Sequence, residues 1–77
     1  MIVLWQDGYM VDWDWATQLT VWTSGPDRAE ERVGTHRLDS VPGSERKAFA
    51  AARQWWQQTG QAEITRARQR EAADASG

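Results

Sequence analysis

The chain has no cysteine and a single histidine, and no hydrophobic run approaches the roughly 20 residues of a membrane span. Without cysteine, neither a disulfide nor a thiolate metal site can hold a small fold together. His36 alone cannot form a metal site of several imidazoles, and we interpret it as a surface or edge residue, because a catalytic histidine needs an orienting partner. The first residues lack the basic start and apolar stretch of a signal peptide. We therefore expect a cytoplasmic protein without membrane contact.

Catalytic constellations are also missing from the sequence. The stretch GSERK at 43–47 lacks the spacing of a phosphate-binding loop. Asp12 and Asp14 point to one face of a strand, with Asp7 nearby, but three carboxylates fall short of the six or so oxygens that calcium requires. No nucleophile lies in a recognisable pattern with a base. We expect no enzyme activity, no cofactor and no metal.

Large aromatic side chains are what the chain has in abundance, with six tryptophans among 77 residues. A chain of this length buries only a small core and is marginally stable alone. Because each large aromatic buries roughly 150–250 Å², tryptophan is an efficient way to build such a core. We expect most of the indoles to be buried.

Asp7-Gly8 is the clearest local signal, because an Asp-Gly pair between apolar alternating runs favours a two-residue hairpin turn with positive φ at both positions. This turn predicts the pairs Gln6–Tyr9, Trp5–Met10, Leu4–Val11, Val3–Asp12 and Ile2–Trp13. A second turn at 15–17 predicts the pairs Asp14–Gln18, Trp13–Leu19, Val11–Val21 and Met10–Trp22.

Alternation along these strands divides their side chains between two faces of a sheet. The face predicted to meet the core carries Ile2, Leu4, Tyr9, Val11, Trp13, Leu19 and Val21. The opposite face carries Val3, Trp5, Met10, Asp12, Asp14 and Trp22. A slip of one residue would exchange the two faces, so the apolar character of the first set supports this register.

The rest of the chain predicts a loop at 24–32 that could hold one helical turn at 27–32, a fourth strand at 32–38 and a helix at 45–58. Gly34 favours an edge position or a bulge in that strand. Ser44 is the expected N-cap and Gly60 the expected helix stop. Docking on the sheet is expected for Phe49, Ala52 and Trp56, with Trp55 at the margin of the contact.

A second helix is expected at about 61–73, and residues 73–77 are expected to be disordered. The predicted fold class is α+β: an antiparallel meander of three to four strands with one amphipathic helix on one face. We divide the chain into a single sheet-plus-helix domain at 1–60 and a C-terminal helical extension at 61–77.

The functional hypothesis follows from the face that this helix would leave open. Exposed apolar patches mark interaction sites, and tryptophan often anchors interfaces. Residues 1–23 contain three acids and no base, so the patch is expected to be acidic. The predicted partner-binding residues are Trp5, Met10, Asp12, Asp14 and Trp22, in a non-catalytic module such as the compact inhibitors or adaptors that phages use against host proteins. The same patch could instead form a homodimer.

The alternative hypothesis is a nucleic-acid-associated regulator. Its C-terminal helix would place Arg66, Arg68 and Arg70 on phosphates. The formal net charge of −2, and the acids of the first strands, argue against a nucleic-acid partner.

Overall fold

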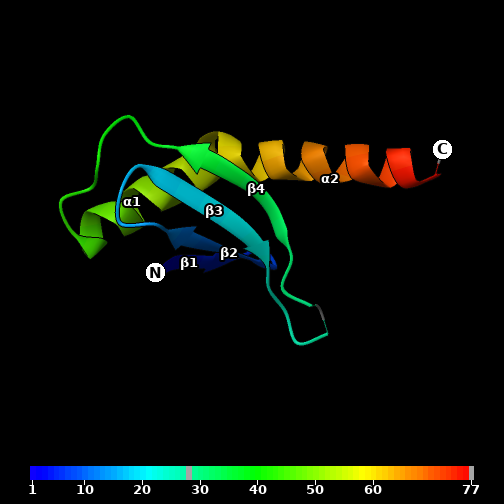
Figure 1. The fold of residues 1–77 in the computed structure, drawn as a ribbon, viewed down its shortest axis with the longest axis horizontal. Helices are drawn as coiled ribbons and strands as arrows, with labels where there is room; N and C mark the ends of the chain where they lie inside the picture. The colour runs from blue at the N-terminus through cyan, green and yellow to red at the C-terminus, as the bar shows by residue number, and fades with distance from the viewer. Residues whose placement is uncertain (28, 77) are drawn as a thin grey trace.

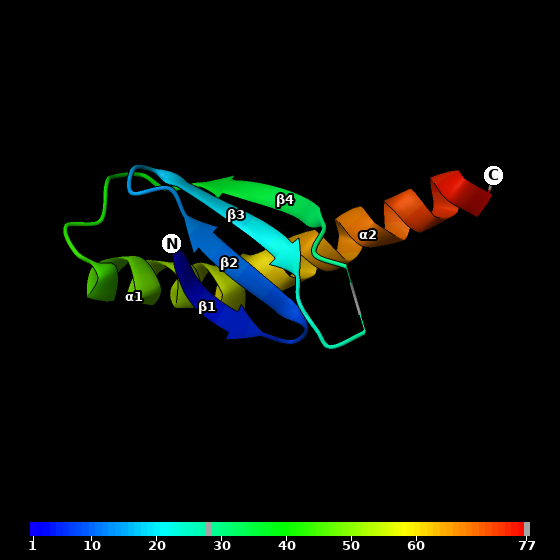
Figure 2. The ribbon, with the colours of Figure 1, turned by 60° about the horizontal axis from the view of Figure 1, so that its bottom comes forward.

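A computed structural model describes residues 1–27 and 29–76 of the chain, with residues 74–76 described by their backbone alone. Four antiparallel strands form one sheet in the order β1-β2-β3-β4, followed by two helices joined through a π-helical turn. The elements are β1 (Ile2–Gln6), β2 (Tyr9–Trp13), β3 (Gln18–Thr23), β4 (Arg32–Arg37), α1 (Glu45–Trp55), η1 (Trp56–Gly60) and α2 (Gln61–Ser76). The helices lie on one side of the sheet, and α2 extends beyond it (Figures 1 and 2). The α+β meander is therefore as predicted.

The first hairpin turns at Asp7-Gly8, with φ values of 57° and 83°. Both are positive, as the two-residue turn requires. The pairs Gln6–Tyr9, Trp5–Met10 and Leu4–Val11 are confirmed. This turn therefore sets the register of β1 against β2 near the hairpin.

Farther from the turn, the predicted register of β1 is wrong because the strand contains a bulge. Ile2 pairs with Asp12, and the register shifts between Ile2 and Leu4, so Val3 is the extra residue. A bulge places two residues opposite one and reverses the alternation beyond it. Val3 and Leu4 both lie in the core cluster. Ile2 instead pairs with Asp12, which is on the side of the sheet away from the core.

The second hairpin has the predicted register, with Trp13–Leu19, Val11–Val21 and Met10–Trp22 as pairs. The turn that joins its strands holds Trp15 at φ 66°, which is unusual for a bulky residue. The Trp15 ring packs on the Trp13 ring, with 4.7 Å between their centroids. This contact offsets part of the backbone strain.

The fourth strand is present and forms an edge of the sheet, as Gly34 indicated. Its register against β3 shifts between Val21 and Trp22, so Val33 is a second bulged residue. The preceding loop is closed by Thr23, whose hydroxyl donates to the Ala29 carbonyl at 2.8 Å and accepts from the Glu31 amide at 3.0 Å. The helical turn suggested for 27–32 is absent from the described residues of that range.

Helix α1 begins at the predicted cap, where the Ser44 hydroxyl accepts a hydrogen bond from the Lys47 amide. Its buried face consists of Ala48, Ala52, Trp55 and, just after the helix, Trp56. Two predictions for this face are wrong, because Phe49 is 42% exposed and Trp55 is 6% exposed. The face of α1 that packs on the sheet is centred on Ala48 and Ala52, and Phe49 lies outside this face.

Gly60 does not stop the helix, contrary to the prediction. It is the last residue of η1, and the amide of Gln61 donates to the carbonyl of Trp56 across the widened turn. A side chain at Gly60 would place its Cβ 2.7 Å from the Trp55 ring. Glycine is needed here for close packing, and not for a left-handed backbone.

The widened turn carries the chain into α2 with Ile64 facing the sheet. Ile64 is 4% exposed, belongs to the core cluster and packs over Gly34, so the start of α2 is part of the core. Arg68 reaches back to the Tyr9 hydroxyl at 3.2 Å. The helix continues to Ser76, past the expected end at 73, and the expected disorder of 73–77 stays a prediction. Gly77 lies outside the described residues.

We predict that Gly60→Ala destabilises the protein although alanine is the better helix former. Alanine gains about 1 kcal/mol of helix propensity, but overpacking against the rigid Trp55 ring costs about 1–3 kcal/mol. Urea unfolding should give a lower midpoint for this variant. Gly43→Ala is the control, because its Cβ would meet only the flexible Lys47 side chain at 3.6 Å, and its midpoint should stay unchanged.

Candidate functional site

The side of the sheet that faces away from α1 is uncovered over the described residues (Figure 2). We call it the open face. Three rows of side chains cross it, because residues paired between strands lie beside one another. The aromatic row contains Trp5, Met10, Trp22 and Arg32; the middle row contains Ile2, Asp12, Thr20 and Thr35; and the polar row contains Asp14, Gln18 and Arg37.

The aromatic row brings together three predicted partner-binding residues. Met10 lies between Trp5 on one neighbouring strand and Trp22 on the other. Trp5 is 65% exposed and Trp22 is half-buried, whereas Met10 is 8% exposed. Met10 is outside the core cluster, so its burial is due to its neighbours on the open face. The row is an apolar shelf with an indole on each side.

The predicted acids are near this shelf, but each already has a partner within the chain. The Asp12 carboxylate accepts from the Met1 amino group at 2.6 Å, and this ion pair neutralises its charge. One oxygen of Asp14, Oδ1, accepts from the amides of Ala16 at 2.9 Å and Gln18 at 3.1 Å. These two bonds close the turn in the manner of an Asx turn.

Asp7 also has a structural contact. Its Oδ2 accepts a hydrogen bond from the indole nitrogen of Trp56 at 3.0 Å. Since Trp56 is 1% exposed, this bond satisfies a buried donor and ties the first hairpin to the helix. The three carboxylates therefore each form contacts that stabilise the fold.

Sequence reasoning missed the basic side of the open face. Arg32 and Arg37 lie on β4 at the ends of the aromatic and polar rows, and neither forms an ion pair with a described residue. The bulge at Val33 brings Arg32 beside Trp22, and nothing in the sequence locates this bulge beyond the weak signal of Gly34. The open face thus carries arginines on β4, and on its other side the carboxylates of Asp12, which is paired with Met1, and of Asp14, just after β2.

The structure separates the three arginines that were considered for nucleic acid. Arg66 and Arg70 are one turn apart on α2 and line a shallow hollow with Glu63. Arg68 faces another side, with its guanidinium carbon 5.9 Å from the centre of the Tyr9 ring. The hydrogen bond from Arg68 to the Tyr9 hydroxyl raises the pKa of the guanidinium above its ordinary value. The guanidinium groups do not converge on one surface.

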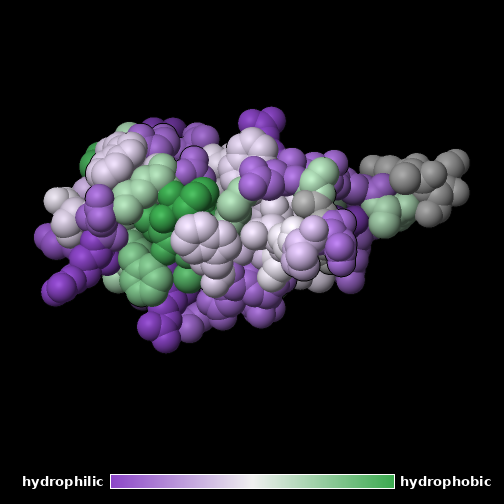
Figure 3. Space-filling model, turned by 90° about the horizontal axis from the view of Figure 1, so that it is seen from below, coloured by the Kyte–Doolittle hydropathy of each residue, from purple (hydrophilic) through white to green (hydrophobic). Residues whose placement is uncertain are grey.

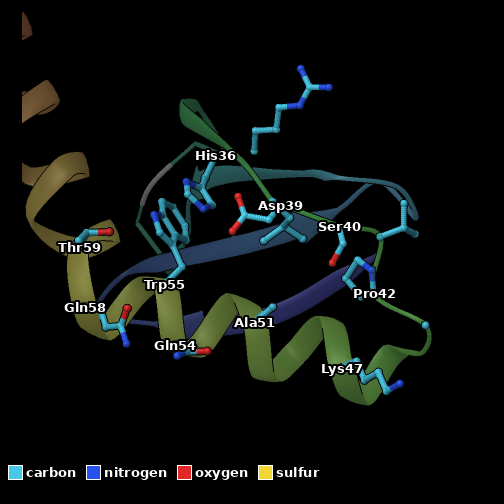
Figure 4. Close-up of a pocket in the computed structure, with 14 residues that line it drawn as sticks. His36, Asp39, Ser40, Pro42, Lys47, Ala51, Gln54, Trp55, Gln58 and Thr59 are labelled. Carbon is cyan, nitrogen blue, oxygen red and sulfur yellow. The ribbon is translucent and has the colours of Figure 1, made fainter.

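A hollow of about 650 Å³ lies between the end of β4, the segment 38–43 and α1 (Figure 4). Its lining includes His36, Asp39 and Ser40, but no hydrogen bond joins these side chains in the described part of the chain. The His36 ring stacks on Trp55 with 4.5 Å between centroids and 12° between planes. The arrangement is that of a histidine packed at an edge of the core, and not of a nucleophile held by a base.

Apolar surface also gathers where β1 meets α1, on the left half of the view from below (Figure 3). Exposed apolar side chains in these elements and next to them include Met1, Trp5 and Phe49. The unpaired edge of β1 borders this surface, and the bulge at Val3 makes that edge irregular. Bulges of this kind weaken pairing between exposed edges.

Comparisons of the chain with protein-family models, with curated proteins and with solved structures find no significant match. No helix among the described residues is long and apolar enough to cross a membrane. The same residues contain no group of three or more His, Cys, Asp or Glu side chains placed to hold a metal ion. The open face is the feature from which a function can be argued.

We predict that Asp14→Ala lowers the free energy of unfolding by about 1–2 kcal/mol, because two amides of the second turn lose their acceptor. Asp14→Asn keeps the side-chain oxygen and removes only the charge, so its stability should stay within about 0.5 kcal/mol of the original. Chemical denaturation of both variants checks the difference. Equal loss in the two variants would mean that the charge of Asp14, and not its turn bonds, stabilises the fold.

Proposed function

We propose that the chain is a small, non-catalytic protein-binding module that acts in the cytoplasm and uses its open face to occupy the surface of another protein. The single observation that carries this proposal is the aromatic row, which leaves Trp5 65% exposed beside Met10 and Trp22 on a face without a covering helix. Exposure of such an apolar row to water is unfavourable, and binding to a protein surface would remove the row from water.

The shape of the row suits protein recognition. Indoles bring large contact area with few rotatable bonds, and they are enriched among the residues that dominate binding energy. Met10 offers an adaptable apolar surface between them. A module of 77 residues that binds in this way fits the role of a compact inhibitor or adaptor, of the kind phages use against host proteins. That role is an analogy with a class of small proteins.

The electrostatics of the site differ from the acidic rim expected from the sequence. Asp12 is neutralised by the Met1 amino group and Asp14 is engaged by two amides, whereas Arg32 and Arg37 have no ion pair with a described residue. Asp12 and Asp14 therefore contribute less attraction for a basic partner than their number suggests. Steering by the open face comes from both signs of charge.

The arrangement of the arginines on α2 does not favour binding of nucleic acid. Arg68 is held at Tyr9 and faces away from Arg66 and Arg70. A fluorescent single-stranded oligonucleotide should show no change in anisotropy with the protein at low salt, where phosphate contacts are strongest. Binding that weakens steeply as salt rises would contradict the proposal and support the regulator hypothesis.

We predict that the double variant Trp5→Ser with Trp22→Ser loses captured protein partners while it stays folded, because both indoles lie outside the core cluster. The measurement is affinity capture from an extract of the source organism, with circular dichroism as the check on folding. Trp15→Ser is the matched control. Trp15 is 57% exposed but packs on Trp13 at the end of the sheet, so partners should be retained.

A folded double variant that keeps the same partners would overturn the proposal. Unfolding of the double variant would show that these indoles support the fold. In that case Trp5→Ser alone gives the answer, because Trp5 is the most exposed of the large apolar side chains of the described residues.

A further inference from the structure

We propose that the open face docks on the open face of a second copy of this chain, in a sandwich of two sheets whose twofold axis runs along β3. This inference rests on the proposed function, because it takes the open face to be a protein-docking surface and names one occupant for it. Charged and aromatic groups are distributed over the three rows so that a second copy of the face complements them.

Charge on the open face is divided by strand. Asp14 directly follows β2, beyond Asp12 with its Met1 ion pair, and Arg32 and Arg37 are on β4, with β3 between the two sides. Neighbouring strands are about 4.8 Å apart, so the two charged lines lie roughly 10 Å apart and symmetrically about β3. A surface with opposite charges on either side of a central line matches a copy of itself that is turned about that line.

Rotation about an axis along β3 keeps each row over the same row of the second copy and exchanges β2 with β4. Arg37 then meets Asp14 of the second copy, and the reciprocal pair forms by symmetry. Asp14 can accept this contact because Oδ1 takes both turn amides and no described residue bonds to Oδ2. Two salt bridges therefore close the polar-row end of the sandwich.

The same rotation places Arg32 of one copy over Met10 of the other, between the indoles of Trp5 and Trp22. A guanidinium between two indole faces makes cation–π contacts, and its methylene stem packs on apolar surface. Trp22 lies nearest the axis and meets its own counterpart. Arg32, which forms no ion pair with a described residue, thus gains contacts with the aromatic row of the second copy.

Other arrangements of two copies are less favourable. A twofold axis across the strands would put β2 on β2 and β4 on β4, which brings like charges together. Pairing of sheet edges is hindered at β1 by the bulge at Val3, and at β4 by the bulge at Val33. Face-to-face packing about β3 is the arrangement that the observed side chains fit.

The size of the open face sets the expected affinity. Rotation about β3 stacks β2, β3 and β4 of the two copies and leaves β1 outside the overlap. Three strands of about five residues cover roughly 14 by 17 Å, which is small beside standard protein interfaces. We therefore expect a reversible dimer with a dissociation constant in the micromolar to high micromolar range. Such a dimer leaves the face available to a tighter partner, so the two proposals are compatible.

The test is sedimentation equilibrium of the full chain from about 10 μM to about 1 mM, a range that brackets this affinity. The original protein should pass from monomer to dimer, and added salt should shift the transition to higher concentration. Asp14→Asn and Arg37→Gln should each raise the dissociation constant roughly 5- to 30-fold, since each removes two salt bridges from a symmetric dimer. The variant with both changes should be about as weak as either single variant.

Arg46→Gln is the control, because Arg46 is exposed on α1, on the other side of the sheet, and its loss changes the net charge by the same amount. This variant should dimerise like the original protein. Trp5→Ser with Trp22→Ser should abolish the dimer, and Trp15→Ser should not.

Three results would overturn the inference, and they separate it from the proposed function. A monomer at about 1 mM contradicts self-docking but leaves a different protein as the occupant of the face. A dimer whose dissociation constant is unchanged by both Asp14→Asn and Arg37→Gln contradicts the twofold arrangement. A dimer retained by the folded double-serine variant forms through another surface and contradicts self-docking of the open face, whereas the proposed function is overturned only if that variant also keeps its captured partners.

Discussion

The hydrogen bond between the Trp56 indole and Asp7 holds together the two ends of this small fold. It joins the helix to the turn of the first hairpin, 49 residues earlier in the chain, at 3.0 Å. The Trp56 indole is buried, and the aspartate that shapes the hairpin turn accepts the hydrogen bond of its nitrogen. The helix is thereby fixed to one side of the sheet, and the other side stays open.

Close packing between α1 and the sheet explains how a single layer of helix can build the core of this fold. Ala48 and Ala52 are fully buried, and they let α1 approach the strands closely. Gly60 and Gly34 do the same for the Trp55 ring and for Ile64. Positions with little or no side chain thus let the helix approach the strands and make room for the Trp55 indole and for Ile64. Among the described residues no further helix covers the second face, and the aromatic row remains there.

Local signals in the sequence predicted most of the sheet but not its bulges. Asp7-Gly8 determined the first turn, and the apolar alternation determined the register of β2 against β3. The bulges at Val3 and Val33 depend on tertiary packing, because each turns a valine toward the core. For this reason Val3 was assigned to the wrong face. Only tertiary contacts reveal such a change in alternation.

The helices show the same limit. Ser44 is a local capping signal and was predicted correctly. Gly60 is typical of a helix stop in sequence, but in the structure it packs against the Trp55 ring of the preceding turn, and its backbone continues through a π-helical turn. Within α1 the buried stripe is Ala48, Ala52 and Trp55, so the roles predicted for Trp55 and Phe49 were interchanged. Of the open-face residues, Trp5, Met10 and Trp22 followed from alternation, whereas Arg32 required the bulge.

The division of the tryptophans between a covered and an open face gives the most direct test of this account. Indole N–H resonances can be followed by nuclear magnetic resonance while the protein is concentrated from about 50 μM to about 1 mM. The account predicts that the signals of Trp5 and Trp22 move with concentration, together with the amides of β4, while those of Trp55 and Trp56 stay fixed. Shifts confined to α1, or no shift at Trp5 and Trp22 both on concentration and on addition of a captured partner, would contradict it.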